Sequence, residues 1–136
     1  MVFGFEFDSV LDLQPLLFMK FSFENLEVYK LSIKWVEVTE SILDRNPKIS
    51  RSLGDQLSRA ALSIPLNIAE GNGRWHAGDK RQFFWIARGS VFECVPIVEI
   101  LKIKSIISSD ECELLRGQLE VLGKMLTRLI QAHEDK

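Results

Sequence analysis

The stretch from Ser58 to Arg74, which reads SRAALSIPLNIAEGNGR, constrains the fold more than any other part of the chain. From Leu53 onward, apolar or small residues recur every three or four positions, a spacing that places them on one face of an α-helix. These positions are Leu57, Ala60, Ala61, Ile64 and Ile68. We expect the helix to stop at Gly71, because glycine suits the left-handed position after a helix end, and Gly73 to carry the chain through the turn.

Two features inside this helix break local rules. Pro65 has no N–H and its ring crowds the carbonyl of Ala61, which in a helix interior costs roughly 3 kcal/mol and bends the axis. Asn67 and Glu70 place polar groups one turn further on, close to the apolar face. Two interpretations are open. The helix could have a kink with a solvated polar edge, or Asn67 or the freed Ala61 carbonyl could make a defined contact between helices, because a buried polar group must find a partner.

Three groups of residues carry a resemblance to a known family. The first is Arg59-Ala60-Ala61 with the run around the proline, whose signature positions are Ser63, Pro65, Asn67, Glu70, Gly71 and Gly73. The second is the block 86–90 followed by Glu93, and the third is the block 23–28. Together they resemble the four-helix bundle proteins of the 23S rRNA intervening-sequence family, whose relatives include the accessory protein of diversity-generating retroelements. The resemblance covers Phe23 to about Ala132.

The resemblance implies a ring-shaped homo-oligomer, a pentamer, and a partner such as RNA or a reverse transcriptase. This chain departs from the family at two positions. Ser58 stands where many members carry a second basic residue, and Leu66 stands where a small residue is common. The retroelement accessory proteins owe their affinity for nucleic acid to a strongly basic surface, whereas this chain has a net charge of −2. The two substitutions and the lack of a strongly basic surface make nucleic-acid binding a weaker expectation for this chain than for those relatives.

The remaining pattern predicts an all-α, antiparallel up-and-down four-helix bundle over residues 23–133, kinked at Pro65 and also at Pro96. We expect the first helix over residues 23–43, a linker over 44–52, a loop over 71–78 and a third helix over about 79–104. Ser108 and Glu111 predict a capping box at the start of the fourth helix. We expect residues 1–22 to form a poorly ordered N-terminal extension. For the first eighteen residues, the alternative is a tail that binds a partner.

Two heptad seams predict the core of the last two helices. The seam of the third helix is Phe84, Ala87, Val91, Cys94, Val98 and Leu101. The seam of the fourth is Leu115, Leu119, Leu122, Leu126, Leu129 and His133. In the first helix one stripe is Val28, Leu31, Trp35, Val38 and Ile42, and a second is Leu26, Tyr29, Ile33, Val36 and Leu43. The first and third helices thus carry more apolar surface than one four-helix core can cover, which predicts a homo-oligomer.

The sequence offers no catalytic, metal or cofactor site. His76 and His133 have no spacing that pairs them with Cys94 or Cys112 as metal ligands, and Gly89-Ser90 lacks the flanking glycines of a nucleophile elbow. The first eighteen residues lack the basic region of a signal peptide and are too interrupted by charges to cross a membrane. We therefore expect a cytoplasmic protein that is not an enzyme, with no cofactor, no membrane partner and no small-molecule substrate.

One group of residues is unusual for a solvated helix face. The partner-binding candidates on it and next to it are Arg59, Arg74, Trp75, Lys80, Arg81, Trp85, Arg88 and Phe92. The segment from Arg51 to Arg88 holds six basic and three acidic residues in a chain that is acidic overall. Three interpretations are open: the rings pack on a neighbouring helix while the arginines are solvated, the stripe is a subunit interface, or it contacts nucleic acid.

We therefore expect a ring-forming assembly and binding module that contacts RNA or a nucleic-acid enzyme. The alternative is a self-assembling structural or protein-interaction module with no nucleic-acid role. An aromatic and basic stripe outside the core seam is consistent with both.

Removing the eighteen residues before Met19 should leave the thermal midpoint nearly unchanged, because both the helix pattern and the family resemblance start after them. Thermal unfolding followed by circular dichroism measures this. A fall of more than a few degrees would show that Phe3, Phe5 or Phe7 packs on the bundle.

Overall fold

The computed structural model describes residues 21–134 and holds no β-strand in that range. A short 3₁₀ turn, η2 (Ser22–Asn25), precedes four α-helices. They are α1 (Glu27–Arg45), α2 (Arg51–Asn72), α3 (Ala77–Ile103) and α4 (Ser109–Ala132). The predicted all-α four-helix bundle is confirmed. The predicted extension over residues 1–22 lies almost entirely outside the described residues.

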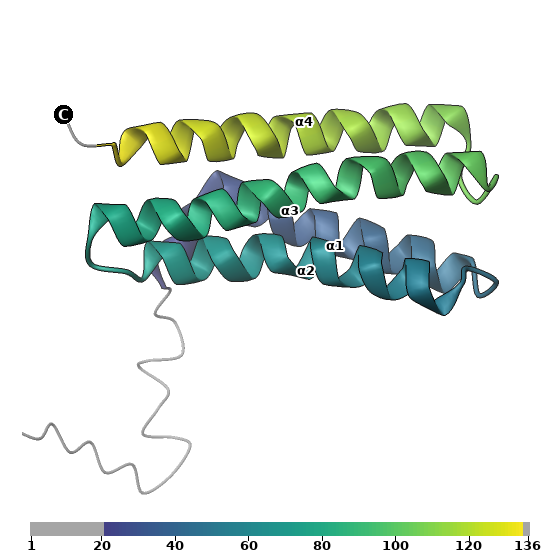
Figure 1. Cartoon of the computed structure of the whole chain (residues 1–136), viewed down its shortest axis with the longest axis horizontal. Helices are drawn as coiled ribbons and strands as arrows, with labels where there is room; N and C mark the ends of the chain where they lie inside the picture. Colours follow the sequence, from purple (N-terminus) through teal and green to yellow (C-terminus); the bar gives the residue numbers. More distant parts are fainter. Residues whose placement is uncertain (1–20, 135–136) are drawn as a thin grey trace, which may run out of the picture.

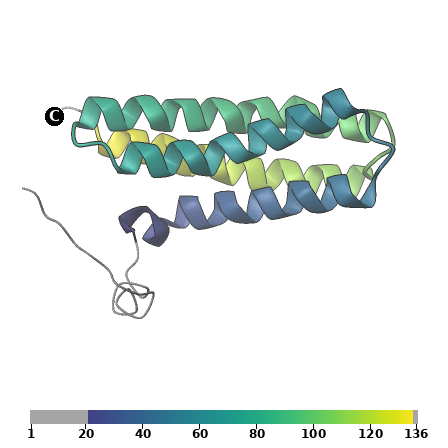
Figure 2. The ribbon, with the colours of Figure 1, turned by 90° about the horizontal axis from the view of Figure 1, so that it is seen from below.

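Each of the four helices packs against two others, so the bundle is closed. The α1–α2 and α3–α4 connections lie at one end of the bundle and the α2–α3 connection lies at the other, so that successive helices run in opposite directions (Figure 1, Figure 2). Each helix packs on the next, and α4 closes the ring on α1. The contact between α2 and α3 is the most extensive of the four, and the contact between α1 and α4 is the least.

The sequence-predicted seams of α2 and α3 form the core. All five predicted positions of α2 and all six of α3 are buried. In α4 the seam holds through Leu126 and then moves from Leu129, which is only partly buried, to Ile130. An α-helix has 3.6 residues per turn, so a strict seven-residue repeat drifts around the cylinder and the next residue turns inward.

Helix α1 buries two hydroxyl side chains that the apolar pattern did not reveal. Val28, Trp35 and Ile42 are buried at seven-residue spacing, and Ser32 and Thr39 lie between them with no exposed surface. The Ser32 hydroxyl donates to the Tyr29 carbonyl at 2.6 Å, and Thr39 donates to the Val36 carbonyl at 2.8 Å. Because each hydroxyl is satisfied within its own helix, it needs no partner on another helix.

The expected surplus of apolar surface on the first helix is wrong. Of its second stripe only Ile33 is exposed, at 37%. The η2 turn packs on α1 and α2, and its Phe23 ring meets the Tyr29 ring edge-on at 4.9 Å. The turn therefore covers part of the stripe that the pattern left without a neighbour.

Gly71 has a different role from the one expected. Helix α2 continues through it to Asn72, and no glycine among the described residues has a positive φ. A Cβ at position 71 would lie 2.8 Å from Phe84 Cε1 and 2.9 Å from Phe83 Cβ. Gly71 therefore lets α2 approach α3 closely, and Gly73 caps the helix in an ordinary right-handed conformation.

The left-handed helix end occurs instead at Ser105, after α3. Its φ is 59°, the one positive value among the described non-glycine residues. The Ile106 N–H donates to the Leu101 carbonyl and the Ser105 N–H donates to the Lys102 carbonyl, both at 2.9 Å. These two bonds are the Schellman pattern, in which glycine is the usual residue at the left-handed position.

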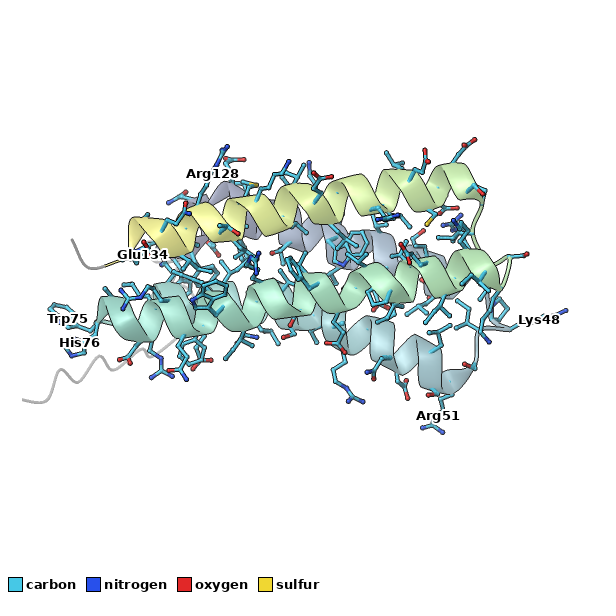
Figure 3. All side chains as sticks on the ribbon, turned by 45° about the horizontal axis from the view of Figure 1, so that its top comes forward. Lys48, Arg51, Trp75, His76, Arg128 and Glu134 are labelled. Atoms are coloured by element: carbon cyan, nitrogen blue, oxygen red, sulfur yellow. The ribbon has the colours of Figure 1, made fainter. Side chains whose placement is uncertain are left out.

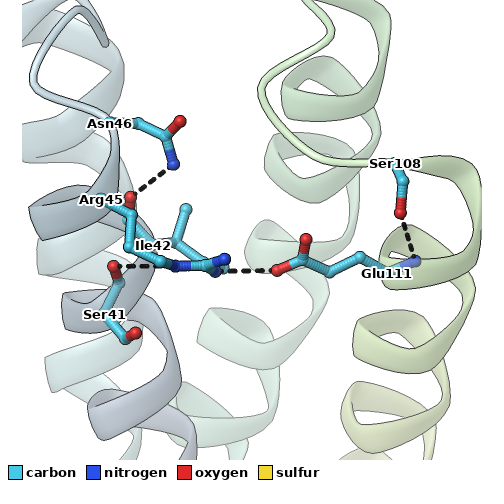
Figure 4. A network of polar contacts seen from close by, with 6 residues as sticks. All are labelled: Ser41, Ile42, Arg45, Asn46, Ser108 and Glu111. Atoms are coloured by element: carbon cyan, nitrogen blue, oxygen red, sulfur yellow. Dashed lines mark hydrogen bonds and ion pairs between the residues drawn. The ribbon is translucent and has the colours of Figure 1, made fainter.

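One of the two hydrogen bonds of the predicted capping box forms at the start of α4, and the other does not. The Ser108 hydroxyl accepts the Glu111 N–H at 3.1 Å. The Glu111 carboxylate accepts instead from Arg45 Nη2 at 2.9 Å, across the gap between α4 and α1 (Figure 4). This ion pair ties together the two helices that share the least extensive contact.

We expect Gly71→Ala to lower the free energy of unfolding by about 1–3 kcal/mol, because the added methyl group overpacks the α2–α3 contact against two phenylalanines. Gly117→Ala in α4 is the matched control, since nothing lies within 4 Å of a Cβ built there. That variant should gain roughly 0.5–1 kcal/mol. Urea unfolding of both variants measures the difference, and equal effects would contradict the close approach.

Candidate interaction surface

The family signature builds the contact between α2 and α3. The Asn67 side-chain amide donates to the Ser63 carbonyl at 2.7 Å and to the Ser63 hydroxyl at 2.9 Å. The Ser90 hydroxyl on α3 bonds the same Ser63 hydroxyl at 2.8 Å. Asn67 therefore bonds only within α2, contrary to the interpretation that it contacts another helix, and the polar contact between α2 and α3 is made by Ser63 and Ser90 instead.

Pro65 and Pro96 both lie inside helices that continue on either side of them. Pro65 is buried in α2, whereas Pro96 is exposed on α3. The bend expected at each proline stays a prediction. Glu70 lies beyond the turn that contains Asn67, and its carboxylate accepts from Arg74 at 2.7 Å.

Three of the predicted basic residues have partners within the bundle. The guanidinium of Arg74 pairs with Glu70 and stacks 4.6 Å from the centre of the Phe83 ring. Lys80 donates to the Asn72 carbonyl at 2.7 Å, at the end of α2, and Arg81 donates to the His133 carbonyl, at the end of α4. Cations at these positions satisfy terminal carbonyls and complement the negative ends of two helix dipoles.

Arg88 lies between the two predicted aromatic residues of its stripe. Its guanidinium carbon is 4.2 Å from the centre of the Phe92 ring and 5.3 Å from that of Trp85. Its Nε donates to the Thr127 hydroxyl of α4 at 2.9 Å. Trp85 is 50% exposed and Phe92 53%. The interpretation with solvated arginines is wrong for Arg88, which Thr127 holds, whereas both rings are half exposed and the Phe92 ring lies near Gly123 of α4.

Exposed apolar residues continue along the whole of α3 beyond this stack. We call the positions Trp85, Gly89, Phe92, Pro96, Ile100 and Ile103 the α3 outer face. Their spacing of 4, 3, 4, 4 and 3 follows one side of a helix. Ile103 is 76% exposed and Ile86, beside the row, is 47% exposed. The face lies opposite the buried seam, so α3 is apolar on two sides.

A groove of about 760 Å³ runs along the α3–α4 side of the bundle. Val91, Phe92 and Val95 line it from α3, and Gly117 and Gly123 line it from α4. Its charged lining residues are Arg88, Glu113, Arg116, Glu120, Lys124 and Arg128. Lys124 hydrogen-bonds Glu120 and lowers the pKa of that carboxyl, and Arg116 pairs with Glu99 at 3.1 Å.

The remaining candidates do not converge on one site. Trp75 is 90% exposed and lies with His76 at the end of the bundle that holds the α2–α3 connection (Figure 3). Arg59 is exposed on α2, away from the α3 stack. The structure thus brings together only Trp85, Arg88 and Phe92. Sequence reasoning missed Thr127 and the exposed Ile100 and Ile103, although the 4, 3, 4, 4, 3 spacing could have identified the isoleucines.

Within residues 21–134 no cluster of His, Cys, Asp or Glu could hold a metal ion, and no helix there is long and apolar enough to span a membrane. Burial raises the pKa of the Cys94 thiol to about 12, and the nearby Trp35 N–H offsets only part of this effect. That N–H has no partner with proper hydrogen-bond geometry, since a thiol is a weak acceptor.

Residues 24–128 match the protein family described as 23S rRNA-intervening sequence protein. The chain is also similar to a crystal structure of a protein with unknown function from the S23 ribosomal protein family of Bacteroides thetaiotaomicron. That match has 21% sequence identity and a TM-score of 0.70, and it covers 76% of this chain and 97% of the other. At this identity the likeness shows the fold alone. No curated protein matches the chain.

We expect Cys94 to be inert in the folded protein, because a thiol with a pKa of about 12 is ionised to only about one part in ten thousand at pH 8. The Cys112→Ala variant leaves Cys94 as the single thiol. Labelling with a coloured disulfide reagent should be slow in buffer and fast in urea. Equal rates in the two conditions would contradict the burial of this thiol.

Proposed function

The chain belongs to the family of 23S rRNA-intervening sequence proteins, and we propose that it is a non-enzymatic assembly module that forms a ring-shaped homo-oligomer through the α3 outer face. The family resemblance implies five copies in the ring. On this proposal the assembled ring binds a partner molecule rather than a substrate.

The observation that carries this proposal is the second apolar side of α3. One side of the helix is the core seam, whose six residues have at most 1% exposure. The opposite side leaves Trp85, Phe92 and Ile103 at least half exposed. Contiguous exposed apolar surface is uncommon on monomeric proteins and marks interaction sites. The face runs from Trp85 to the end of α3 at Ile103, a length of roughly 27 Å at 1.5 Å per residue, which gives a second chain an extended surface.

The residue types on this surface also support an interface between protein chains. Trp, Phe and Arg are enriched at such interfaces, and the Trp85–Arg88–Phe92 stack contains all three. Thr127 fixes the guanidinium from the neighbouring helix. Less side-chain freedom is therefore lost when a partner covers the stack.

Gly89 lies within the α3 outer face, and the isolated chain gives no packing reason for it. A Cβ built at position 89 has no atom within 4 Å, yet glycine inside a helix costs roughly 0.5–1 kcal/mol relative to alanine. At position 71, glycine is explained by the close packing of α2 on α3. Gly117 on α4 has the same open space, but Gly89 lies on the α3 outer face, where glycine would allow the close approach of a helix from another copy.

A contact with RNA, or with a nucleic-acid enzyme such as a reverse transcriptase, is the second candidate. The exposed Trp75 favours it, because an aromatic ring open to solvent can stack on an unpaired base. Arg74, Lys80, Arg81 and Arg88 favour it less, since each already binds a group within the bundle.

We expect wild-type protein to sediment at several times 15.6 kDa. Gly89→Leu should convert it to a monomer, because the added side chain occupies the point of closest approach, and no atom of the chain lies within 4 Å of its Cβ. Gly117→Leu is the matched control, a mid-helix glycine on α4 that also has no atom within 4 Å of its Cβ. It should stay oligomeric. Sedimentation velocity of the three proteins measures the outcome.

A monomeric wild type would sink the assembly proposal. An oligomeric Gly89→Leu variant with an unchanged sedimentation coefficient would place the interface on another surface. Circular dichroism of each variant provides the folding control, and both leucine variants should keep the helical signal of the wild type.

A further inference from the structure

A second pocket, of about 700 Å³, lies between the α1–α2 connection and the α3–α4 turn. Figure 3 shows Lys48 and Arg51 at this end of the bundle, opposite Trp75 and His76. Residues 45–50 and 104–106 line the pocket. Three of these nine residues, Arg45, Lys48 and Lys104, are cations, and none is acidic. A concave surface lined by one sign of charge concentrates ions of the opposite sign.

Arg45 is held in position at the wall of this pocket. Its Nη2 donates to Glu111 Oε1 at 2.9 Å and its Nε donates to the Ser41 carbonyl at 3.3 Å (Figure 4). A guanidinium carries more N–H donors than these two bonds use. Because Glu111 balances the charge of Arg45, the net attraction for an anion comes from the two lysines.

Lys48 and Lys104 differ from the basic residues predicted from the sequence. Both are exposed, and neither has an ion-pair or hydrogen-bond partner for its ammonium group within residues 21–134. Arg74, Lys80 and Arg81, by contrast, each bind a carboxylate or a terminal carbonyl of the bundle. The lysines of the pocket are therefore free to bind a ligand from solution.

The rest of the lining fits a phosphorylated ligand. Ser50 is the N-cap of α2, and its hydroxyl accepts the Leu53 N–H at 3.3 Å, so the positive end of the α2 dipole lies at this pocket. The C-terminal ends of α1 and α3 lie here as well, so the attraction for an anion rests on the two lysine charges. Pro47, Ile49 and Ile106 provide apolar walls, and no aromatic residue is among the lining residues. Such a site can hold phosphate groups and pack against a sugar, but it cannot stack a base, so its binding would not depend on base sequence.

We propose that this pocket binds phosphate groups, either those of a polynucleotide backbone or those of a free oligophosphate. All the lining residues come from two connections of one chain, so the site is complete in a single copy, although Lys104 directly follows Ile103 of the α3 outer face. It also differs in position from the stripe of basic and aromatic residues on α3.

The test uses the full chain and a fluorescent single-stranded RNA of about 20 nucleotides, with anisotropy measured at about 50 and 200 mM salt. The variant is Lys48→Glu with Lys104→Glu. The matched control is Lys34→Glu with Arg128→Glu, two exposed cations outside the pocket with the same change in net charge. Arg45 is left unchanged, because its loss would break the α1–α4 ion pair.

We expect the pocket variant to bind at least tenfold more weakly and its slope of log affinity against log salt to be smaller in magnitude by about 1.4, at roughly 0.7 for each phosphate contact. The control should stay within about twofold of wild type. Sodium tripolyphosphate, added at constant ionic strength, distinguishes a site that binds free oligophosphate from a site that requires the polynucleotide backbone. Displacement of the RNA shows that free oligophosphate suffices, and retention shows that the polynucleotide is required.

Three results would overturn the proposal: no RNA or tripolyphosphate binding by wild type at low salt, equal weakening in variant and control, or unchanged binding in the pocket variant. Sedimentation of the same samples separates this outcome from that of assembly. A wild-type oligomer that binds no phosphate refutes the pocket alone, whereas a wild-type monomer whose phosphate binding depends on the two lysines refutes assembly alone.

Discussion

The close packing of α2 on α3 around Gly71 determines how the rest of the bundle is arranged. At this point there is no room for a side chain, because the ring of Phe84 and the Cβ of Phe83 occupy the space. Two turns further toward the start of α2, the Ser63–Ser90 bond fixes the relative rotation of the two helices. With α3 held in this way, its seam faces the core and its second apolar side must face outward. The outer surface is thus a consequence of the inner contact.

The sequence predicted most of the core, and its failures have physical reasons. The seams of α2 and α3 follow the helical period and were found directly. Ser32 and Thr39 were missed because a hydroxyl bonded to its own helix can be buried without an apolar side chain. Gly71 was assigned to a helix end because glycine there has two possible reasons, backbone freedom and the absence of a side chain. Only the position of Phe84 on another helix distinguishes them.

The candidate site was harder to predict, since a charge in the sequence does not reveal what it binds. Arg81 and His133 are far apart along the chain, and they meet only because α3 begins where α4 ends. Lys80 reaches across the α2–α3 turn to a terminal carbonyl. Arg81 was grouped with the candidates by its helical spacing on the α3 stripe, and Lys80 by its position just before that stripe. Lys48 and Lys104 lie beside the C-terminal ends of α1 and α3, but neither ammonium group bonds a terminal carbonyl within residues 21–134, and composition did not single them out.

Ser105 has a further significance that follows from its backbone. A left-handed conformation costs a non-glycine residue roughly 1–2 kcal/mol, and glycine would relieve that strain. Ser105 lines the pocket between the α1–α2 connection and the α3–α4 turn, and glycine would remove its side chain. Under the proposed phosphate binding, stability and ligand binding favour different residues at this one position. A library selected only for heat resistance would be expected to enrich glycine at position 105, and a library selected for binding would be expected to retain serine.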